Sequence, residues 1–247
     1  YRIDLDDLER WGFHDVTRVS VYGYGAEPVG DALLESDYID DLPQAPCEIT
    51  SRGLVFYARG AEELTVSNER YVMHKNGYTD AAYYFLGESE PAEPGRTGIP
   101  GAVNGVTSFT EVLSHEIDLV SPGATGHEML GEDFRFQRSA EFVFDLAGKS
   151  GDNVWAGCRF AVKNVKGAST LALSVNGSGL LPVTSIAASP NDSHQHYRIA
   201  EMSHDITVDG DVLTLGLDFS TKGQAALARL DRITVNYNRR LAMTDGV

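Results

Sequence analysis

The feature that most constrains the fold of this chain is an alternation of apolar and polar residues through its second half. From Ser114 onward, about eight short runs place an apolar side chain at every second position. A period of two puts those side chains on one face of a strand and leaves the other face to water. The clearest apolar sets are Phe142, Phe144 and Leu146, then Leu171, Leu173 and Val175, then Leu213, Leu215, Leu217 and Phe219, then Ile233, Val235 and Tyr237.

Turn sequences separate these runs. Asn176-Gly177, Asp209-Gly210 and Lys222-Gly223 are typical of the tight turns that join antiparallel strands. Helical periodicity is absent from this part of the sequence. The pattern therefore predicts a mainly β fold, with an antiparallel β-sandwich of jelly-roll, galactose-binding-like type over residues 111–247.

Residues 1–110 have a different pattern, which predicts a smaller β-rich domain with one short helix. Asp6 or Asp7 is a suitable N-cap for a helix that Gly12 ends. Apolar runs too short for helices predict further strands, and we expect the last two of them to be buried. The expected strands are 1–5, 17–22, Gly53–Ala58 and Ala82–Leu86.

A cluster of Pro, Glu and Gly between Gly87 and Gly105 breaks any regular strand pairing. Such a segment is a linker or a long hairpin tip. We therefore place the boundary between the two β units near residue 110.

The charge of the chain restricts its partners. With 36 Asp plus Glu against 20 Lys plus Arg, the formal net charge is -16, which repels a phosphate backbone, and we expect no nucleic-acid partner. No apolar run approaches the roughly 18 residues of a membrane helix, so we expect no direct membrane insertion. The chain opens at Tyr1 without an initiator Met or a signal sequence, and we expect it to be cut from a longer protein.

The two cysteines, Cys47 and Cys158, are too few for a disulfide scaffold and lack the spacing of a metal or redox site. They form one bridge at most. Two small buried hydrophobic residues are the favoured interpretation, with a disulfide as the alternative.

The sharpest local signal for chemistry is Ser193-His194-Gln195-His196, followed by Glu201. On a strand the two histidines point to one face, and with Glu201 they form the first half of a cupin-like metal site. A complete site needs a second His motif downstream, where His204 is the only histidine. Exposed histidines at a turn are favoured, with metal binding by His194, His196 and Glu201 as the alternative.

Two other kinds of ligand are compatible with the sequence. Asp37, Asp40 and Asp41 predict either a solvated acidic loop or a structural Ca²⁺ site completed by backbone carbonyls, with no other cofactor. Aromatic residues on a sandwich face are the usual sugar-stacking device of lectin-like jelly rolls, although strand aromatics more often belong to the core. Tyr197, Tyr237 and Trp155 are the candidates, so glycan binding or adhesion is an alternative function.

An ordered set of motifs is spread over nearly the whole chain. It comprises Tyr1-Arg2-Ile3 with Leu5-Asp6-Asp7-Leu8 and Gly12-Phe13, then Val19-Ser20-Val21-Tyr22-Gly23-Tyr24-Gly25, then Leu54-Val55-Phe56-Tyr57-Ala58-Arg59-Gly60 with Tyr83-Tyr84-Phe85-Leu86, then Thr125-Gly126-His127-Glu128-Met129-Leu130-Gly131-Glu132, and finally Leu230-Asp231-Arg232-Ile233-Thr234-Val235-Asn236-Tyr237. In this order they resemble the N-terminal β region of the gingipain-type cysteine peptidase family of Bacteroidetes, in particular the sortases of type IX secretion.

The resemblance implies a non-catalytic module of a secreted or outer-membrane-associated surface protein. In that family the β region precedes a peptidase domain that uses a Cys nucleophile and a His base. Neither Cys47 nor Cys158 lies in a family-like nucleophile setting, so no catalytic residue carries over to this chain. We expect the module to position the downstream peptidase domain and to contact other secretion or surface proteins.

Overall fold

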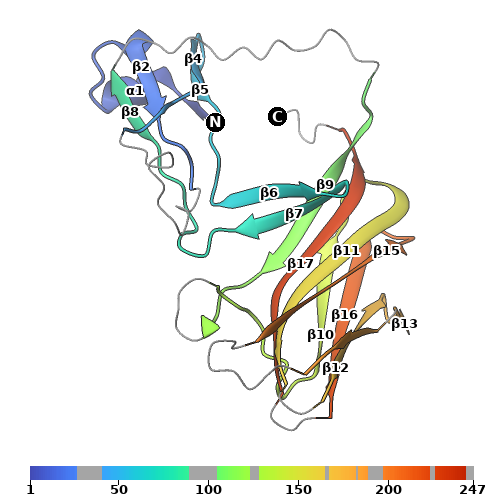
Figure 1. The fold of residues 1–247 in the computed structure, drawn as a ribbon. Coiled ribbons are helices and arrows are strands. Elements are labelled where there is room, and N and C mark those ends of the chain that lie inside the picture. The colour runs from blue at the N-terminus through green and yellow to red at the C-terminus, as the bar shows by residue number, and fades with distance from the viewer. Residues whose placement is uncertain are drawn as a thin grey trace. The chain divides into compact units, whose positions relative to one another are not determined.

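The computed structural model describes residues 1–26, 41–88, 105–122, 128–164, 167–181, 183–188, 197–222 and 226–242, and these are mainly β (Figure 1). The chain divides into two compact units. The first unit holds Tyr1–Glu63 and His74–Val103, and the second holds Leu64–Met73 and Asn104–Val247. The predicted mainly β fold class is confirmed.

This division differs from the expected boundary near residue 110 in two ways. The second unit begins at Asn104, because strand β9 (Ser108–Glu116) pairs with β17 (Leu227–Arg240) from Ser108 onward. It also includes Leu64–Met73 from the hairpin of β6 (Glu62–Ser67) and β7 (Arg70–Lys75). This segment belongs to the second unit because its contacts are with residues far along the chain. No local sequence pattern predicts those contacts.

The first unit contains two three-stranded antiparallel sheets and helix α1 (Leu5–Arg10). One sheet has the order β1 (Arg2–Ile3), β5 (Gly53–Phe56), β4 (Cys47–Thr50). The other has the order β3 (Gln44–Ala45), β2 (Val19–Tyr22), β8 (Phe85–Glu88), and β2 follows a 3-10 turn, η1 (Val16–Arg18). The core of this unit consists of Leu8, Val19, Val21, Ala45 and Leu54.

The helix of the first unit starts earlier than predicted. Its N-cap is Asp4, and Asp6 and Asp7 lie in its first turn, where carboxylates interact favourably with the helix dipole. The chain leaves the helix through Gly12 at φ +94°, a conformation that favours glycine, as the sequence predicts.

The prediction of fully buried strands in the first unit is wrong for both runs. Leu54 is fully buried, but its neighbour Val55 is 40% exposed, and Phe85 in β8 is 56% exposed. Each of these small sheets is packed against the core on one face only. An apolar run in such a sheet therefore does not imply burial on both sides.

The second unit is a sandwich of two antiparallel sheets. One has the order β15 (Arg198–Thr207), β11 (Lys149–Lys163), β17, β9. The other has the order β10 (Ser139–Asp145), β16 (Val212–Thr221), β12 (Ser169–Val175), β13 (Ser178–Leu180), with β14 (Thr184–Ile186) also paired to β12. Most successive long strands alternate between the sheets, as in the predicted jelly roll.

The apolar positions of the alternating pattern face one another between these sheets. Phe160 of β11 is fully buried and meets Phe134 edge-on, with ring centroids 5.2 Å apart. Leu213, Leu215 and Leu217 of β16 are buried with them. The core residues predicted for this unit are therefore correct except Val175, which is only partly buried, because a period of two selects one face of each strand.

The predicted turns divide into two kinds. Asn176 and Gly177, both at positive φ, close the β12–β13 hairpin. Asp209 and Gly210 instead connect β15 to β16, which lie in different sheets, so that hairpin prediction is wrong. Gly223 lies outside the described residues. No helix among the described residues is long and apolar enough to cross a membrane.

Candidate functional site

The candidate site lies on the outer face of the sheet that contains β15, β11 and β17. Alternation turns every second residue of these strands away from the core, and the strand register aligns them in three rows. The rows are Glu201–Arg159–Arg232, Ser203–Gly157–Thr234 and Asp205–Trp155–Asn236. Charged and polar side chains from three strands are thereby concentrated in one area.

A hollow of about 490 Å³ opens over these rows, and all of its lining residues belong to the second unit. The β6–β7 hairpin forms its remaining wall through Asn68, Arg70 and Val72. The buried side chain of Asn236 holds this hairpin by pairing with both backbone groups of Tyr71. Its Oδ1 accepts from the Tyr71 N–H at 2.7 Å, and its Nδ2 donates to the Tyr71 carbonyl at 2.9 Å.

The six-membered ring of Trp155 occupies space beside residue 157 that only a glycine leaves open. A Cβ at Gly157 would lie 2.6 Å from the indole Cη2 and 3.0 Å from Cζ2. Any other side chain would therefore displace the ring. Both residues line the hollow.

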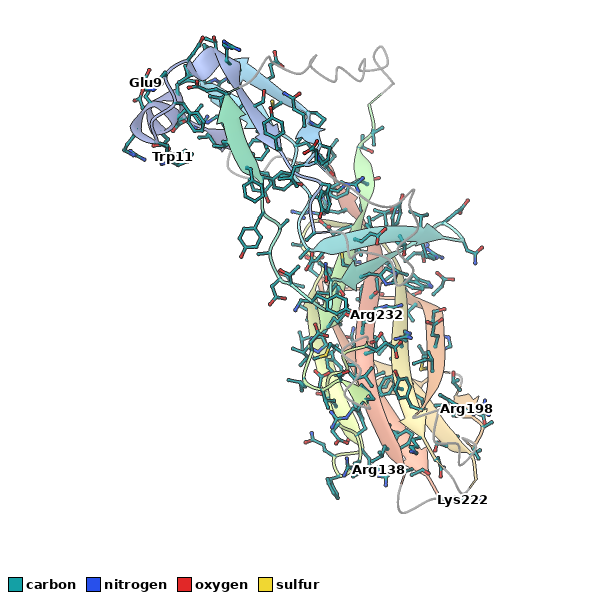
Figure 2. All side chains as sticks on the ribbon, turned by 60° about the vertical axis from the view of Figure 1, so that its left-hand side comes forward. Glu9, Trp11, Arg138, Arg198, Lys222 and Arg232 are labelled. Carbon is teal, nitrogen blue, oxygen red and sulfur yellow. The ribbon has the colours of Figure 1, made fainter. Side chains whose placement is uncertain are left out.

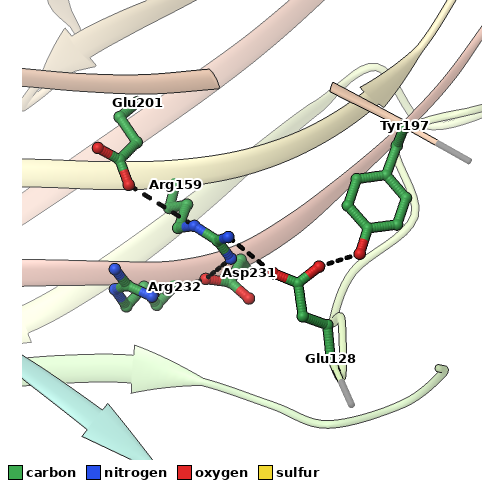
Figure 3. Close-up of polar contacts among 6 residues, drawn as sticks. All are labelled: Glu128, Arg159, Tyr197, Glu201, Asp231 and Arg232. Atoms are coloured by element: carbon green, nitrogen blue, oxygen red, sulfur yellow. Dashed lines mark hydrogen bonds and ion pairs between the residues drawn. The ribbon is translucent and has the colours of Figure 1, made fainter. Parts of the chain in front are cut away.

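An ion-pair network centred on Arg159 forms the other end of the site (Figure 3). Its guanidinium contacts Asp231 Oδ2 through Nη1 at 2.9 Å and Glu128 Oε1 through Nη2 at 2.8 Å. Glu201 Oε1 lies 3.6 Å from Nε. The Tyr197 hydroxyl donates to the second oxygen of Glu128. Carboxylates thus fix the Arg159 side chain in one orientation.

A β-bulge in β17 explains how Asp231 reaches this network. Arg159 pairs with Arg232, but the next residue, Phe160, pairs with Leu230, so Asp231 is an extra residue. The bulge directs the Asp231 carboxylate to both arginines, and Arg232 Nη1 also lies 2.9 Å from its Oδ2. Figure 2 labels Arg232 on this sheet.

The surroundings of Arg159 stabilise its charge. Desolvation acts to lower its pKa, but hydrogen bonds to Glu128 and Asp231 outweigh that effect and raise the pKa above its usual value. Arg159 is therefore a permanent cation that is already paired. Thr234 is in the opposite situation: it is 2% exposed, and its Oγ1 has no hydrogen-bond partner among the described residues.

Most of the residues predicted for the metal and Ca²⁺ sites lie outside the part of the chain that the structure describes. His194 and His196 lie outside the described residues, as do Asp37 and Asp40. Glu201 is exposed on β15 and faces Arg159. Within the described ranges, no group of three or more His, Cys, Asp or Glu side chains is arranged to hold a metal. The metal and Ca²⁺ sites remain predictions.

The three aromatic residues proposed as a sugar platform do not share a face. Tyr237 is 3% exposed in the core, and its hydroxyl donates to the Ala147 carbonyl at 3.2 Å. Tyr197 is held by Glu128. Only Trp155 lines the hollow. The platform as predicted is wrong, because Tyr237 has the inward parity of β17.

The cysteines are both free, so the disulfide alternative is wrong. Cys158 is 7% exposed on the inner face of β11, and burial raises the pKa of its thiol to about 12. Cys47 is partly buried and packs against the core of the first unit.

Sequence reasoning missed the Arg159 network and the hairpin wall. The outward-facing residues of the three strands were visible as the polar half of the alternation, but their alignment depends on register. Alternation of Trp155, Gly157 and Arg159 on one strand was the available signal.

Comparison with known structures gives a match that covers the whole chain. No protein-family model and no curated protein matches the chain. The crystal structure of dimeric latent PorU from Porphyromonas gingivalis is similar at TM-score 0.78 and 25% sequence identity, covering 100% of this chain and 24% of that chain.

A carbohydrate-binding domain is a much weaker match. The CBM36-1 domain of a multidomain xylanase from the hindgut metagenome of Trinervitermes trinervoides is 11% identical at TM-score 0.36, covering 56% of this chain and 100% of that chain. A likeness this weak carries no ligand over to this chain. The resemblance predicted from the sequence is confirmed by the first match: this chain is similar over its whole length to PorU, of which it spans about a quarter.

Proposed function

We propose that this chain is a non-catalytic β module of a secreted, gingipain-like surface protein, and that it positions a peptidase domain of the same polypeptide. The observation that carries the proposal is the similarity to PorU over 100% of this chain but only 24% of that one. A module that is one part of a larger architecture contributes by its surfaces and by its contacts with the other parts.

The state of Cys158 supports a structural rather than a nucleophilic role. A cysteine nucleophile acts as a thiolate, which a low pKa and access to substrate favour. Cys158 lies in the sandwich core, and burial raises its pKa to about 12, so it is a neutral thiol at pH 7. Its side chain serves as a small apolar core residue.

The test uses the parent polypeptide with a specific protease site inserted after Ala242, the last described residue. We expect the cleaved module and the remainder to co-elute in size-exclusion chromatography, because inter-domain contacts hold them together. We also expect the remainder to melt at a lower temperature once moderate denaturant has separated it from the cleaved module. The uncleaved polypeptide is the control.

Two results would contradict the proposal. One is a parent gene that encodes no domain with a Cys nucleophile and a His base. The other is a cleaved module that separates at once and leaves the peptide hydrolysis and melting temperature of the remainder unchanged.

A further inference from the structure

We propose that the free edge of β15 binds an extended, basic segment of a partner protein, which adds to the sheet as a further strand. This goes beyond the positioning role and does not depend on it. Three features of β15 and its surroundings lead to this partner: its unpaired backbone, an adjoining groove and the charge of its outer face.

The first feature is the backbone of β15. In the described part of the chain, β11 is the only strand that pairs with it. The Val208 N–H donates to the Asp152 carbonyl at 2.9 Å, just beyond the end of β15. Because hydrogen-bonded pairs alternate along an antiparallel ladder, the groups that point away from β11 are those of every second residue. These residues are Ile199, Glu201, Ser203, Asp205 and Thr207.

This edge is long and regular. β15 has ten residues and pairs with β11 in unbroken register, from Arg198 opposite Val162 to Thr207 opposite Asn153. Figure 2 labels Arg198, its first residue. Bulges, prolines and lysines are common means of preventing a further strand from adding to an edge, and β15 has none of them. Its outward N–H and C=O groups are therefore a template for an extended peptide.

The second feature is a groove of about 380 Å³ between β14 and β15. These strands belong to different sheets, so the groove lies where the two layers of the sandwich meet the solvent. Ile186 of β14 and Ala200 of β15 line it and are 5% and 9% exposed. Every second side chain of an added strand would point toward these residues. Apolar side chains are therefore favoured at the inward positions of the partner.

The third feature is the charge beside β15. The ion-pair network on this face contains one more carboxylate than it has guanidinium groups. Its members are Arg70, Arg159 and Arg232 with Glu128, Glu201, Asp205 and Asp231. Two of the carboxylates belong to β15 and have exposed side chains, Glu201 at 67% and Asp205 at 75%. Basic side chains are therefore favoured at the outward positions of the partner.

The same two carboxylates disfavour a second copy of this chain. Two antiparallel copies of β15 centred on Ser203 would place Glu201 of each copy opposite Asp205 of the other. Like charges that lie directly opposite each other destabilise a sheet. The partner that fits the edge is therefore a different chain, with basic and apolar side chains in alternation.

The experiment titrates the 247-residue chain with the capped peptide Thr-Val-Lys-Val-Thr-Val-Lys-Val-Thr and follows binding by calorimetry. The spacing of its two lysines equals that of Glu201 and Asp205 on β15. One control peptide has glutamate in place of lysine. The other is N-methylated at both lysines, whose N–H groups would face β15. We expect saturable binding of the first peptide and at least about tenfold weaker binding of both controls.

Amide hydrogen exchange, resolved by residue, distinguishes strand addition from other modes of binding. We expect the lysine peptide to slow exchange at least about tenfold at Glu201, Ser203 and Asp205. Exchange at Ala200 and Met202 should change little, because their N–H groups already face β11. This alternation is the signature of a new strand on the edge.

Two pairs of variants then assign the surface. Ser203→Pro removes an outward N–H without removing a bond to β11, and we expect it to weaken binding at least about tenfold. Its matched control Ser203→Ala keeps that N–H and should bind normally. Asp205→Lys should weaken the lysine peptide and strengthen the glutamate peptide. The control Asp218→Lys makes the same charge change at an exposed position of β16 and should alter neither.

Four outcomes would overturn the proposal. Equal binding of the N-methylated peptide would exclude backbone pairing, and equal binding of the glutamate peptide would exclude selection by charge. Protection without alternation along β15 would place the peptide elsewhere. A dimer of the chain alone that Ser203→Pro dissociates would show that the edge pairs with a second copy. No saturable binding at millimolar peptide would likewise remove the site, whether or not Ser203→Pro folds.

Discussion

The two units are both built from antiparallel strands, but they bury their apolar surface in different ways. In the second unit two sheets with strands of up to 15 residues enclose one extensive core. In the first unit the strands of both sheets have two to four residues, and the core is small. Stability of a domain rises with the fraction of surface it buries, so we expect the second unit to be the more stable.

The outer faces of the sheets can also be compared between the two units. The inner face of the β15–β11–β17 sheet is mainly apolar, and the outer face carries the hollow and the Arg159 network. Exposed apolar residues occur in both units, such as Val55 and Phe85 in the first and Phe136 and Val143 in the second. A rigid two-layer sandwich supports a polar site more precisely than a small one-faced sheet does.

The largest expected effect comes from Phe160→Ala in the second unit. Phe160 is fully buried against Phe134, and its truncation should lower the free energy of unfolding by about 4 kcal/mol. Denaturant unfolding measures the loss, and hydrogen exchange of residues 1–22 should stay unchanged. Phe136→Ala, at an 87% exposed position, is the control. Equal destabilisation of both units would show that they unfold as one.

Leu8→Ala tests the first unit in the same way. Leu8 is fully buried between α1 and the small sheets, and we expect a loss of about 3 kcal/mol. Because the core of this unit is small, hydrogen exchange should accelerate throughout it while β11 and β17 stay protected. Accelerated exchange in β11 would refute separate stability.

Asn236→Ala tests the attachment of the β6–β7 hairpin to the second unit. The variant removes both hydrogen bonds to Tyr71, and we expect a cost of about 2 kcal/mol. Exchange of the Tyr71 amide proton should accelerate at least tenfold. Asn76→Ala, which removes a bond to the Ala26 carbonyl in the first unit, is the matched control and should leave Tyr71 protected.

The thiol of Cys158 makes stability depend on alkaline pH. Burial raises its pKa from 9.0 to about 12, so above pH 9 the unfolded chain loses a proton that the folded chain retains. Stability therefore falls as pH rises, by about 1.4 kcal/mol at pH 10 from this group. Unfolding at pH 8 and pH 10 should show a smaller fall in Cys158→Ala. An identical fall would mean that the thiol ionises freely in the fold.

The smallest effect is expected for Arg70→Gln. Its ion pair with Asp205 is exposed, so the free energy of unfolding should change by less than about 0.5 kcal/mol. A loss above about 1 kcal/mol would show that this pair supports the fold.

Local pattern predicted the sandwich and most of its core correctly. Phe142, Leu171 and Leu213 face inward because alternation assigns each of them to one side of a strand. The same rule, applied to Tyr237, already placed it in the core, so its choice as a platform residue ignored the parity of its own strand. In the first unit, short apolar runs predicted strands but not how many faces were covered.

Of the candidate site, the sequence named Trp155 and Glu201, each for a different reason than the one the structure gives. Trp155 lines the hollow without the other two predicted aromatic residues. Glu201 is not a metal ligand there but lies beside the guanidinium of Arg159. The predicted platform of Tyr197, Tyr237 and Trp155 is wrong, and glycan binding stays a prediction. The remaining lining residues lie on strands that are far apart in the sequence, so no local pattern groups them.

The sequence by itself determined which residues of each strand turn inward, because side-chain alternation is a property of the extended backbone alone. Only the tertiary structure decided which outward residues meet. The bulge at Asp231 depends on the register between β11 and β17, and the hairpin wall depends on Asn236 meeting Tyr71 across 165 positions of sequence. Register and long-range pairing are set by packing of whole strands, so no local pattern encodes them.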